Sequence, residues 1–272
     1  MSMPNELVFV RHGESEANVA NHADKEGDSS LKSDERFKAR HDSDMRLTPR
    51  GAEQAQITGE WIKENIGEFD RYFYSPYRRT EETMSNLALR PAIGWMENDL
   101  IRERDWGEFG NMTEEEREAH LPFSKQNKDL NPWYWTPSGG ESLATGTRLR
   151  FERFLLTMHN EMEKKRVIAV SHGEYMWVAR FVLERMTVSQ WIESDADKSQ
   201  RIQNAMVLQY TRRDPERPSL IADSARWARA VCPWDESKSI NGGDWWEIER
   251  RTHTEDEIME KVKSYPRLFS EE

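Results

Sequence analysis

The sequence has a single cysteine, Cys232, in 272 residues. This excludes an intramolecular disulfide and a zinc site built on paired cysteines, and it favours a reducing compartment. No apolar run approaches the ~20 residues that a membrane-spanning helix needs. The N-terminal stretch also lacks the basic region and the apolar run of a signal peptide. We therefore expect a cytoplasmic protein that does not engage a membrane.

Positively charged residues are outnumbered by negatively charged ones. The chain carries 39 Lys and Arg against 50 Asp and Glu, a net charge of −11. Such a protein binds nucleic acids and anionic membranes poorly, although a local pocket of arginines can still hold a small anion. The sequence contains neither a P-loop nor a run of carboxylates spaced to hold Mg²⁺. We expect no metal ion and no cofactor.

Short apolar runs alternate with longer amphipathic stretches. The runs predict strands at residues 7–10, 71–74, 167–170, 205–210 and 219–223. Two helices are predicted to begin with an N-cap and a proline in the first position, at Thr48-Pro49 and at Ser75-Pro76. Two more are predicted between Ser142 and Lys165 and over residues 174–186. This alternation predicts an α/β fold, a three-layer sandwich whose central sheet is mainly parallel and is flanked by helices.

Two segments interrupt the alternation, and the chain ends in a third. We expect residues 19–46, which are polar and charged, to form an irregular loop, and residues 111–139 to form a cap on a catalytic domain of residues 1–210. Residues 211–272 form a Trp-rich extension that we expect to pack on the same domain. A capping box from Thr254 to Glu257 begins a late helix there. Two other roles for the extension stay open, closure over a pocket and a homodimer contact.

Two of the predicted strands end in the same way. "LVFVRHG" and "VIAVSHG" each place four apolar residues before a polar residue and a His-Gly pair, which contains His12 in one case and His172 in the other. A lone histidine is usually structural. In an open parallel sheet, however, ligands bind beyond the carboxyl ends of the strands, so two histidines at equivalent ends predict a site.

A third strand is followed by "SPYRRT", which places Arg78 and Arg79 in the first turn of a helix. The helix dipole favours anions there rather than cations. The pair is either solvated or helps to hold an anion at the helix terminus. Together with Arg11 and the two histidines, Arg79 would make a positive site suited to a phosphoryl group, whose oxygens accept forked guanidinium bonds.

These motifs resemble those of the histidine phosphatase superfamily, which includes cofactor-dependent phosphoglycerate mutases and related phosphatases. The resemblance covers residues ~6–210 and rests on ordered pieces: "RHGESEAN", "LTPRG", "SPYRRT", "LIRERDWGEFG", "GGES" and "VSHGE". It implies that His12 is the nucleophile that becomes phosphohistidine. It also implies that Arg11, Arg79 and His172 bind the phosphoryl group, with Arg79 favoured over Arg78 by its spacing, and that Asn18 contacts phosphate or substrate.

The general acid and base has two candidates. The resemblance to the branch with its acid between the two histidines implies Glu103, in "RERDWGEFG", whereas another branch places its acid where Glu174 stands. We favour Glu103. As an ordinary surface carboxylate it would instead pair with Arg102 or Arg104. The neutral imidazole of His12 needs the proton on its other nitrogen to be held, and a nearby backbone carbonyl is a suitable partner.

The substrate is a small phosphorylated molecule that the sequence does not name. The cap segment has glutamates in "MTEEEREAH", and it lacks the arginine pair and proline run of the mutases. This departure favours a metal-independent phosphomonoesterase over a mutase. A non-catalytic binding protein is disfavoured because every matching position is intact. The aromatic residues Trp133, Tyr134 and Trp135 either pack the cap onto the domain, which we favour, or line the site.

Overall fold

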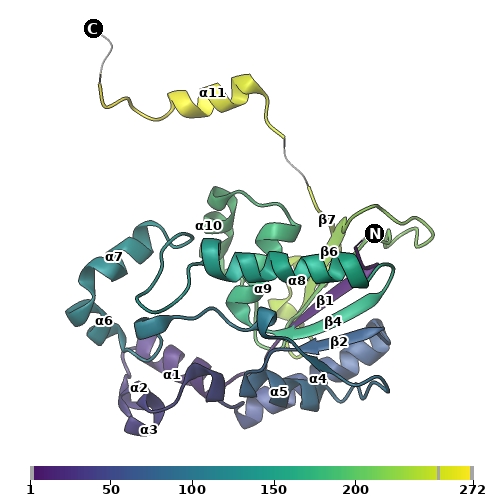
Figure 1. Ribbon diagram of the computed structural model, residues 1–272, viewed down its shortest axis with the longest axis horizontal. Helices are drawn as coiled ribbons and strands as arrows, with labels where there is room; N and C mark the ends of the chain where they lie inside the picture. The colour runs from purple at the N-terminus through teal and green to yellow at the C-terminus, as the bar shows by residue number, and fades with distance from the viewer. Residues whose placement is uncertain (1–2, 250–251, 270–272) are drawn as a thin grey trace.

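A computed structural model describes residues 3–249 and 252–269, and in them a seven-stranded sheet has the order β3-β2-β4-β1-β5-β6-β7 (Figure 1). Its strands are β1 (Glu6–Arg11), β2 (Arg71–Tyr74), β3 (Met96–Glu97), β4 (Arg166–Ser171), β5 (Val207–Thr211), β6 (Trp227–Val231) and β7 (Trp246–Glu247). The pairs from β3 to β1 are parallel, and those from β1 to β7 are antiparallel. The α/β sandwich is confirmed, with a mixed sheet.

Helices cover both faces of this sheet. The longer helices of the described chain, not all of which lie on the sheet, are α1 (Glu16–Lys25), α4 (Pro49–Asn65), α5 (Arg78–Leu87), α7 (Pro122–Leu130), α8 (Arg148–Glu161), α9 (Gly173–Leu183), α10 (Val188–Ala196) and α11 (Glu255–Lys263). Side chains of α8 and α9 pack on one face, and side chains of α4 and α5 pack on the other. As predicted, Thr48 caps α4 with Pro49 in its first turn.

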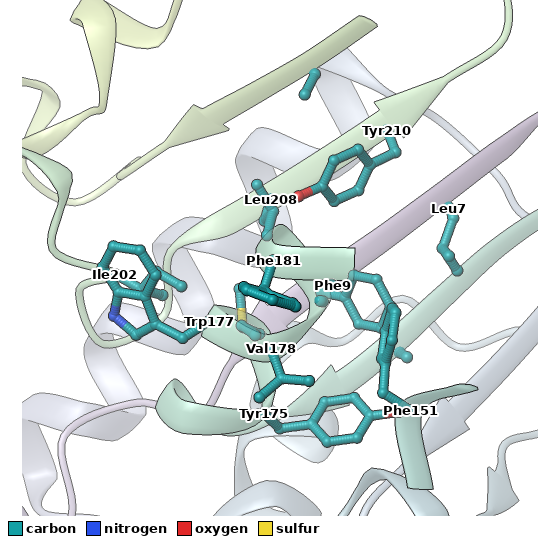
Figure 2. Close-up of a cluster of buried hydrophobic side chains, with 14 of the residues drawn as sticks. Leu7, Phe9, Phe151, Tyr175, Trp177, Val178, Phe181, Ile202, Leu208 and Tyr210 are labelled. Atoms are coloured by element: carbon teal, nitrogen blue, oxygen red, sulfur yellow. The ribbon is translucent and has the colours of Figure 1, made fainter. Parts of the chain in front are cut away.

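The two cores follow from the alternation of side chains along the strands. On the face toward α8 and α9, Phe9 is fully buried, and its ring centroid lies 6.0 Å from that of Phe151 and 6.3 Å from that of Tyr175 (Figure 2). On the opposite face, Val8 and Val10 pack with residues of α4 and α5. β1 is therefore buried on both sides, which explains its continuous apolar run.

The interpretation of residues 19–46 as an irregular loop is wrong. The segment contains most of α1, then α2 (Ser30–Ser33), α3 (Glu35–Lys38) and the short 3₁₀ turn η1 (Asp42–Asp44). A capping box between Ser15 and Asn18 starts α1. The helix buries only Ala17, Ala20 and Asp24, so no apolar period marks it in the sequence. The cap segment likewise contains α6 (Glu114–His120) and α7.

Two further local predictions are wrong. Residues 219–223 form no strand and contribute only an isolated bridge between Arg213 and Ile221. Just before this stretch, the side chain of Asp214 forms a turn by accepting hydrogen bonds from the backbone of Glu216 and Arg217. The strand that pairs with β5 is β6 instead.

The helix after β2 begins at Arg78 and not at Ser75-Pro76, with Tyr77 at its N-cap position. Ser75 has another partner, as described below.

The segment beyond residue 210 has two parts. β6 and β7 extend the sheet, and Trp246 packs against the larger core. Every described residue from Thr252 onward is exposed, and α11 lies apart from the rest of the molecule in Figure 1. The capping box from Thr254 to Glu257 is present. No helix in residues 3–249 and 252–269 is long and apolar enough to cross a membrane.

Candidate active site

The parallel register of β1 and β4 brings the two His-Gly pairs together. Arg11 lies opposite Ser171, so the residues that follow, His12 and His172, leave the sheet side by side. Their ring centroids are 5.3 Å apart. Both are almost completely buried, with 2% and 0% of their surfaces exposed. The prediction that the two histidines meet at the carboxyl edge is confirmed.

The two glycines that follow these histidines are required by close approaches of the chain. A Cβ at Gly13 would lie 2.2 Å from the carbonyl oxygen of Gly51. A Cβ at Gly173 would lie 3.2 Å from Nε of Arg11. The first glycine lets the chain after His12 pass α4, and the second makes room for the Arg11 side chain.

The surroundings of His12 fix its protonation. Its Nδ1 lies 2.7 Å from the carbonyl oxygen of Gly13, which can only accept, so Nδ1 carries the proton and Nε2 keeps a free electron pair. Burial, together with the charges of Arg79 and Arg11, lowers the pKa of His12 well below its usual value of 6.5. The imidazole is therefore neutral at pH 7, as a nucleophile must be.

His172 is oriented by two residues from the connection between β2 and α5. Its Nε2 lies 2.7 Å from Oγ of Ser75, and its ring meets that of Tyr77 edge-on with centroids 4.9 Å apart. Among the described residues, its buried Nδ1 has no hydrogen-bond partner. Burial and the charge of Arg79 lower its pKa well below 6.5. If the Ser75 hydroxyl donates to Nε2, Nδ1 carries the proton and can donate it to a ligand.

Arg11 is the last residue of β1, and one end of its guanidinium group is hydrogen-bonded to the backbone. Its Nη1 donates to the carbonyl of Ile202 at 2.7 Å, whereas its buried Nε finds no partner in the described part of the chain. Burial lowers the pKa of Arg11 to about 10. The guanidinium is thus still charged at pH 7, beside both histidines.

Arg79 approaches the histidines from the first turn of α5. Its side chain is 4% exposed and packs over the ring of Tyr77, with its Cζ 4.8 Å from the ring centroid. Its Nη1 and Nη2 donate to the backbone oxygen and to Oδ2 of Asp42 at 2.6 and 2.9 Å. Arg78 points elsewhere, since it is 58% exposed and paired with Glu81.

Glu103 and Glu174 both lie near this cluster, in different environments. Oε1 of Glu103 accepts from the backbone N–H groups of Arg104 and Tyr175 at 3.0 and 3.3 Å. Burial and the nearby charge of Glu174 raise the pKa of Glu103 to about 7. Glu103 is therefore no surface partner of Arg102, which instead pairs with Asp99 and Glu141.

Asn18 is connected to His12 through Asn204. Its Oδ1 accepts from the backbone and hydroxyl of Ser15, both at 3.1 Å, and from Nδ2 of Asn204 at 2.9 Å. The same Asn204 nitrogen lies 3.2 Å from the carbonyl of His12. With its oxygen occupied, Asn18 has its amide NH₂ group left to donate to a ligand.

Two glutamates of the cap form ion pairs with basic side chains. Glu114 pairs with Arg117 at 2.5 Å, and Glu116 pairs with Lys38 at 2.7 Å. The departure of the cap from the mutases, which favours a phosphomonoesterase, stays a prediction.

The aromatic residues of the cap mostly pack it onto the domain, as favoured above. Trp133 is 1% exposed and stacks on Phe181, with ring centroids 4.0 Å apart. Trp135 is also buried, whereas Tyr134 is exposed.

Sequence reasoning missed Ser75, Tyr77, Asp42 and Asn204. Ser75 was taken for a helix cap, although its place directly after β2 puts it at the same sheet edge as the histidines. Asp42 lies in the segment taken for a loop, and no local signal linked it to Arg79.

Comparisons with known proteins agree with this arrangement. The family model of the histidine phosphatase superfamily, branch 1, matches residues 7–202. A 2,3-bisphosphoglycerate-dependent phosphoglycerate mutase of Methylorubrum extorquens is 26% identical over 185 residues, which cover 66% of this chain and 80% of the mutase.

Solved structures show the same fold. A mycobacterial glucosyl-3-phosphoglycerate phosphatase has a TM-score of 0.57 at 20% identity, and a phosphoserine phosphatase of Entamoeba histolytica has 0.58 at 22%. Each comparison covers 76% of this chain and 91% of the other. Since the family model spans most of the chain and holds both histidine motifs, the protein belongs to branch 1 of the histidine phosphatase superfamily.

Proposed function

We propose that the protein is a metal-independent phosphomonoesterase that acts through a phosphohistidine on His12. The observation that carries this proposal is a set of buried groups without partners among the described residues. Nε of Arg11 is one such donor, and Nδ1 of His172 is another when the Ser75 hydroxyl donates to Nε2 of that ring. The ring of His172 lies 5.3 Å from that of His12, whose Nε2 keeps a free electron pair. Buried donors without partners cost free energy, which a phosphoryl group would recover by accepting from them.

In the first step, Nε2 of His12 attacks phosphorus, and the bond from phosphorus to the leaving oxygen breaks. Arg11, Arg79 and His172 hold the phosphoryl oxygens, with Asn18 donating from its amide. Glu103 gives its proton to the leaving alcohol, and a pKa of about 7 leaves it protonated often enough at neutral pH. The guanidinium groups supply the positive charge that phosphoryl transfer requires.

In the second step, water attacks the phosphohistidine. Glu103, now ionised, takes a proton from that water, and inorganic phosphate leaves with His12 restored. No three His, Cys, Asp or Glu side chains in the described ranges gather as ligands for a metal ion, so the proposal assigns charge stabilisation to the arginines. The lone thiol of Cys232 suits a cytoplasmic enzyme.

The alternative is a phosphoglycerate-type mutase, which the name of the Methylorubrum relative favours. A mutase must keep water from the phosphohistidine until the bound intermediate has reoriented in the site. The side chains of Glu174 and of Asp42, which pairs with Arg79, are 32% and 41% exposed, so solvent reaches residues next to the cluster, which supports hydrolysis.

The proposal is tested by a phosphate-release screen over many small phosphomonoesters in the presence of EDTA, with His12→Ala as the control. We expect release by the wild type only, with an acid-labile phosphate on His12 in quenched reactions. Transfer between substrate hydroxyls without release would support the mutase. Activity that survives His12→Ala, or that EDTA abolishes, would contradict the mechanism.

A further inference from the structure

One arginine of the candidate site is already engaged by a carboxylate of the same chain. Nη2 of Arg79 donates to Oδ2 of Asp42 at 2.9 Å, and Nη1 donates to the backbone oxygen of Asp42 at 2.6 Å. A guanidinium offers its donors as a planar fork, which suits a carboxylate and a phosphoryl group equally well. The Asp42 side chain therefore takes up a donor that the proposed reaction needs.

The two side chains of this ion pair differ in their exposure to solvent. The Arg79 side chain is 4% exposed, and that of Asp42 is 41% exposed. Arg79 has two other supports, the ring of Tyr77 and the backbone oxygen of Asp42. Its position thus does not depend on the Asp42 carboxylate, which can turn into solvent while the backbone contact stays.

The chain on either side of Asp42 is fixed. Arg40 pairs with Glu16 at 3.0 Å, and its carbonyl accepts from Asn111 of the cap at 3.2 Å. After the turn, Arg46 pairs with Glu82 of α5. The Arg46–Glu82 pair ties the chain after this turn to α5, so the Asp42 carboxylate returns to Arg79 whenever no better acceptor occupies the fork.

We propose that Asp42 tunes the affinity of the site by competing with the phosphoryl group for Arg79. The inference rests on the proposed function and adds a residue to it that acts through Arg79. The competition weakens the binding of the substrate and of the product phosphate alike. It therefore speeds the release of inorganic phosphate and lowers the affinity for substrate. A chain that held phosphate too tightly would be inhibited by its own product.

Titration calorimetry of the full chain with inorganic phosphate tests the inference by binding alone. Asp42→Asn and Asp42→Ala both keep the backbone contact to Arg79. We expect them to bind phosphate roughly three- to tenfold more tightly than the wild type, the range of a partly exposed ion pair. Asp44→Asn is the matched control, because Asp44 lies in the same turn, is 58% exposed and reaches only Arg78, at 4.0 Å. It removes the same charge and should change affinity less than about twofold.

Kinetics separate this role from a structural one. We expect the Asp42 variants to lower KM for a phosphomonoester and the inhibition constant of phosphate by similar factors. A residue that merely positioned Arg79 would raise both when removed. Unchanged or weaker phosphate binding by the Asp42 variants, beside a wild type that binds, would overturn the inference and leave the proposed function standing. No phosphate binding by any of the proteins would overturn both.

Discussion

The carboxylate of Glu174 lies 3.1 Å from Nη1 of the buried Arg104 side chain. The same guanidinium donates to the backbone oxygens of Glu141 and Trp135. Glu174 is thus engaged as the partner of a structural arginine, whereas the carboxylate of Glu103 accepts from two backbone N–H groups. This difference assigns the two carboxylates different roles in the proposed reaction.

Replacing Glu103 by Gln should lower kcat/KM for an alkyl phosphate by ~10²–10⁴, the usual contribution of a general acid. His12 should still be phosphorylated by an aryl phosphate, whose leaving group needs no proton. Glu174→Gln keeps a neutral acceptor for Arg104 and is the matched control, with an expected loss below about tenfold. Steady-state kinetics on both substrates decides the assignment, and the reverse ranking of the two variants would show that Glu174 is the acid.

The pH dependence follows from the same residue. Since the pKa of Glu103 is raised to about 7, its proton is present below that pH and lost above it. For an alkyl phosphate, kcat/KM should therefore fall as the pH rises through about 7. The pKa of His12 is lowered, so the nucleophile stays neutral and adds no decline near pH 6.5. Profiles from about pH 5 to about pH 9 check this. An equal alkaline decline for p-nitrophenyl phosphate would contradict the role of Glu103.

Ser75→Ala should impair activity more than stability. The variant leaves Nε2 of His172 without its partner, and the ring loses its preferred tautomer. We expect kcat/KM to drop by about 5- to 100-fold, equivalent to ~1–3 kcal/mol for a lost buried hydrogen bond. Ser171→Ala is the control, because Ser171 is equally buried but donates to the carbonyl of Ile101. Similar activity losses in the two variants would argue against a specific role for Ser75.

Phe9→Ala should reduce the free energy of unfolding by about 3–5 kcal/mol. Phe9 is fully buried on β1 and contacts three aromatic rings, so the cavity cannot close easily. Urea unfolding followed by tryptophan fluorescence measures the change. Phe123→Ala, at a position that is 79% exposed, should change stability by less than about 0.5 kcal/mol. Comparable losses in the two variants would show that the packing of Phe9 contributes less to the free energy of unfolding than expected.

The meeting of His12 and His172 could be predicted because it depends on a general property of parallel sheets. When two buried parallel strands are neighbours, the residues that follow them lie at the same carboxyl edge of the sheet. The tautomer of His12 also depends on local sequence, since the acceptor for its Nδ1 proton is the carbonyl of the adjacent Gly13.

The contacts of Ser75 and Asp42 could not be predicted in this way. Ser75 is 97 residues from His172, and Asp42 is 37 residues from Arg79. The helices near Asp42 bury few large side chains, so they leave no periodic pattern. The same limit applies to the cap glutamates, since the partner of Glu116 is Lys38, from a distant segment.

The place of β1 in the sheet has a consequence for any shortened form of the protein. β1 lies between β4 and β5, and β5 begins at Val207, beyond the 7–202 region that the family model matches. A fragment trimmed to that region would turn the strand that carries the nucleophile into an edge strand. Its unpaired backbone and the apolar residues Leu7 to Val10 would then form a template for aggregation, so the fragment should be insoluble even though it contains every proposed catalytic residue.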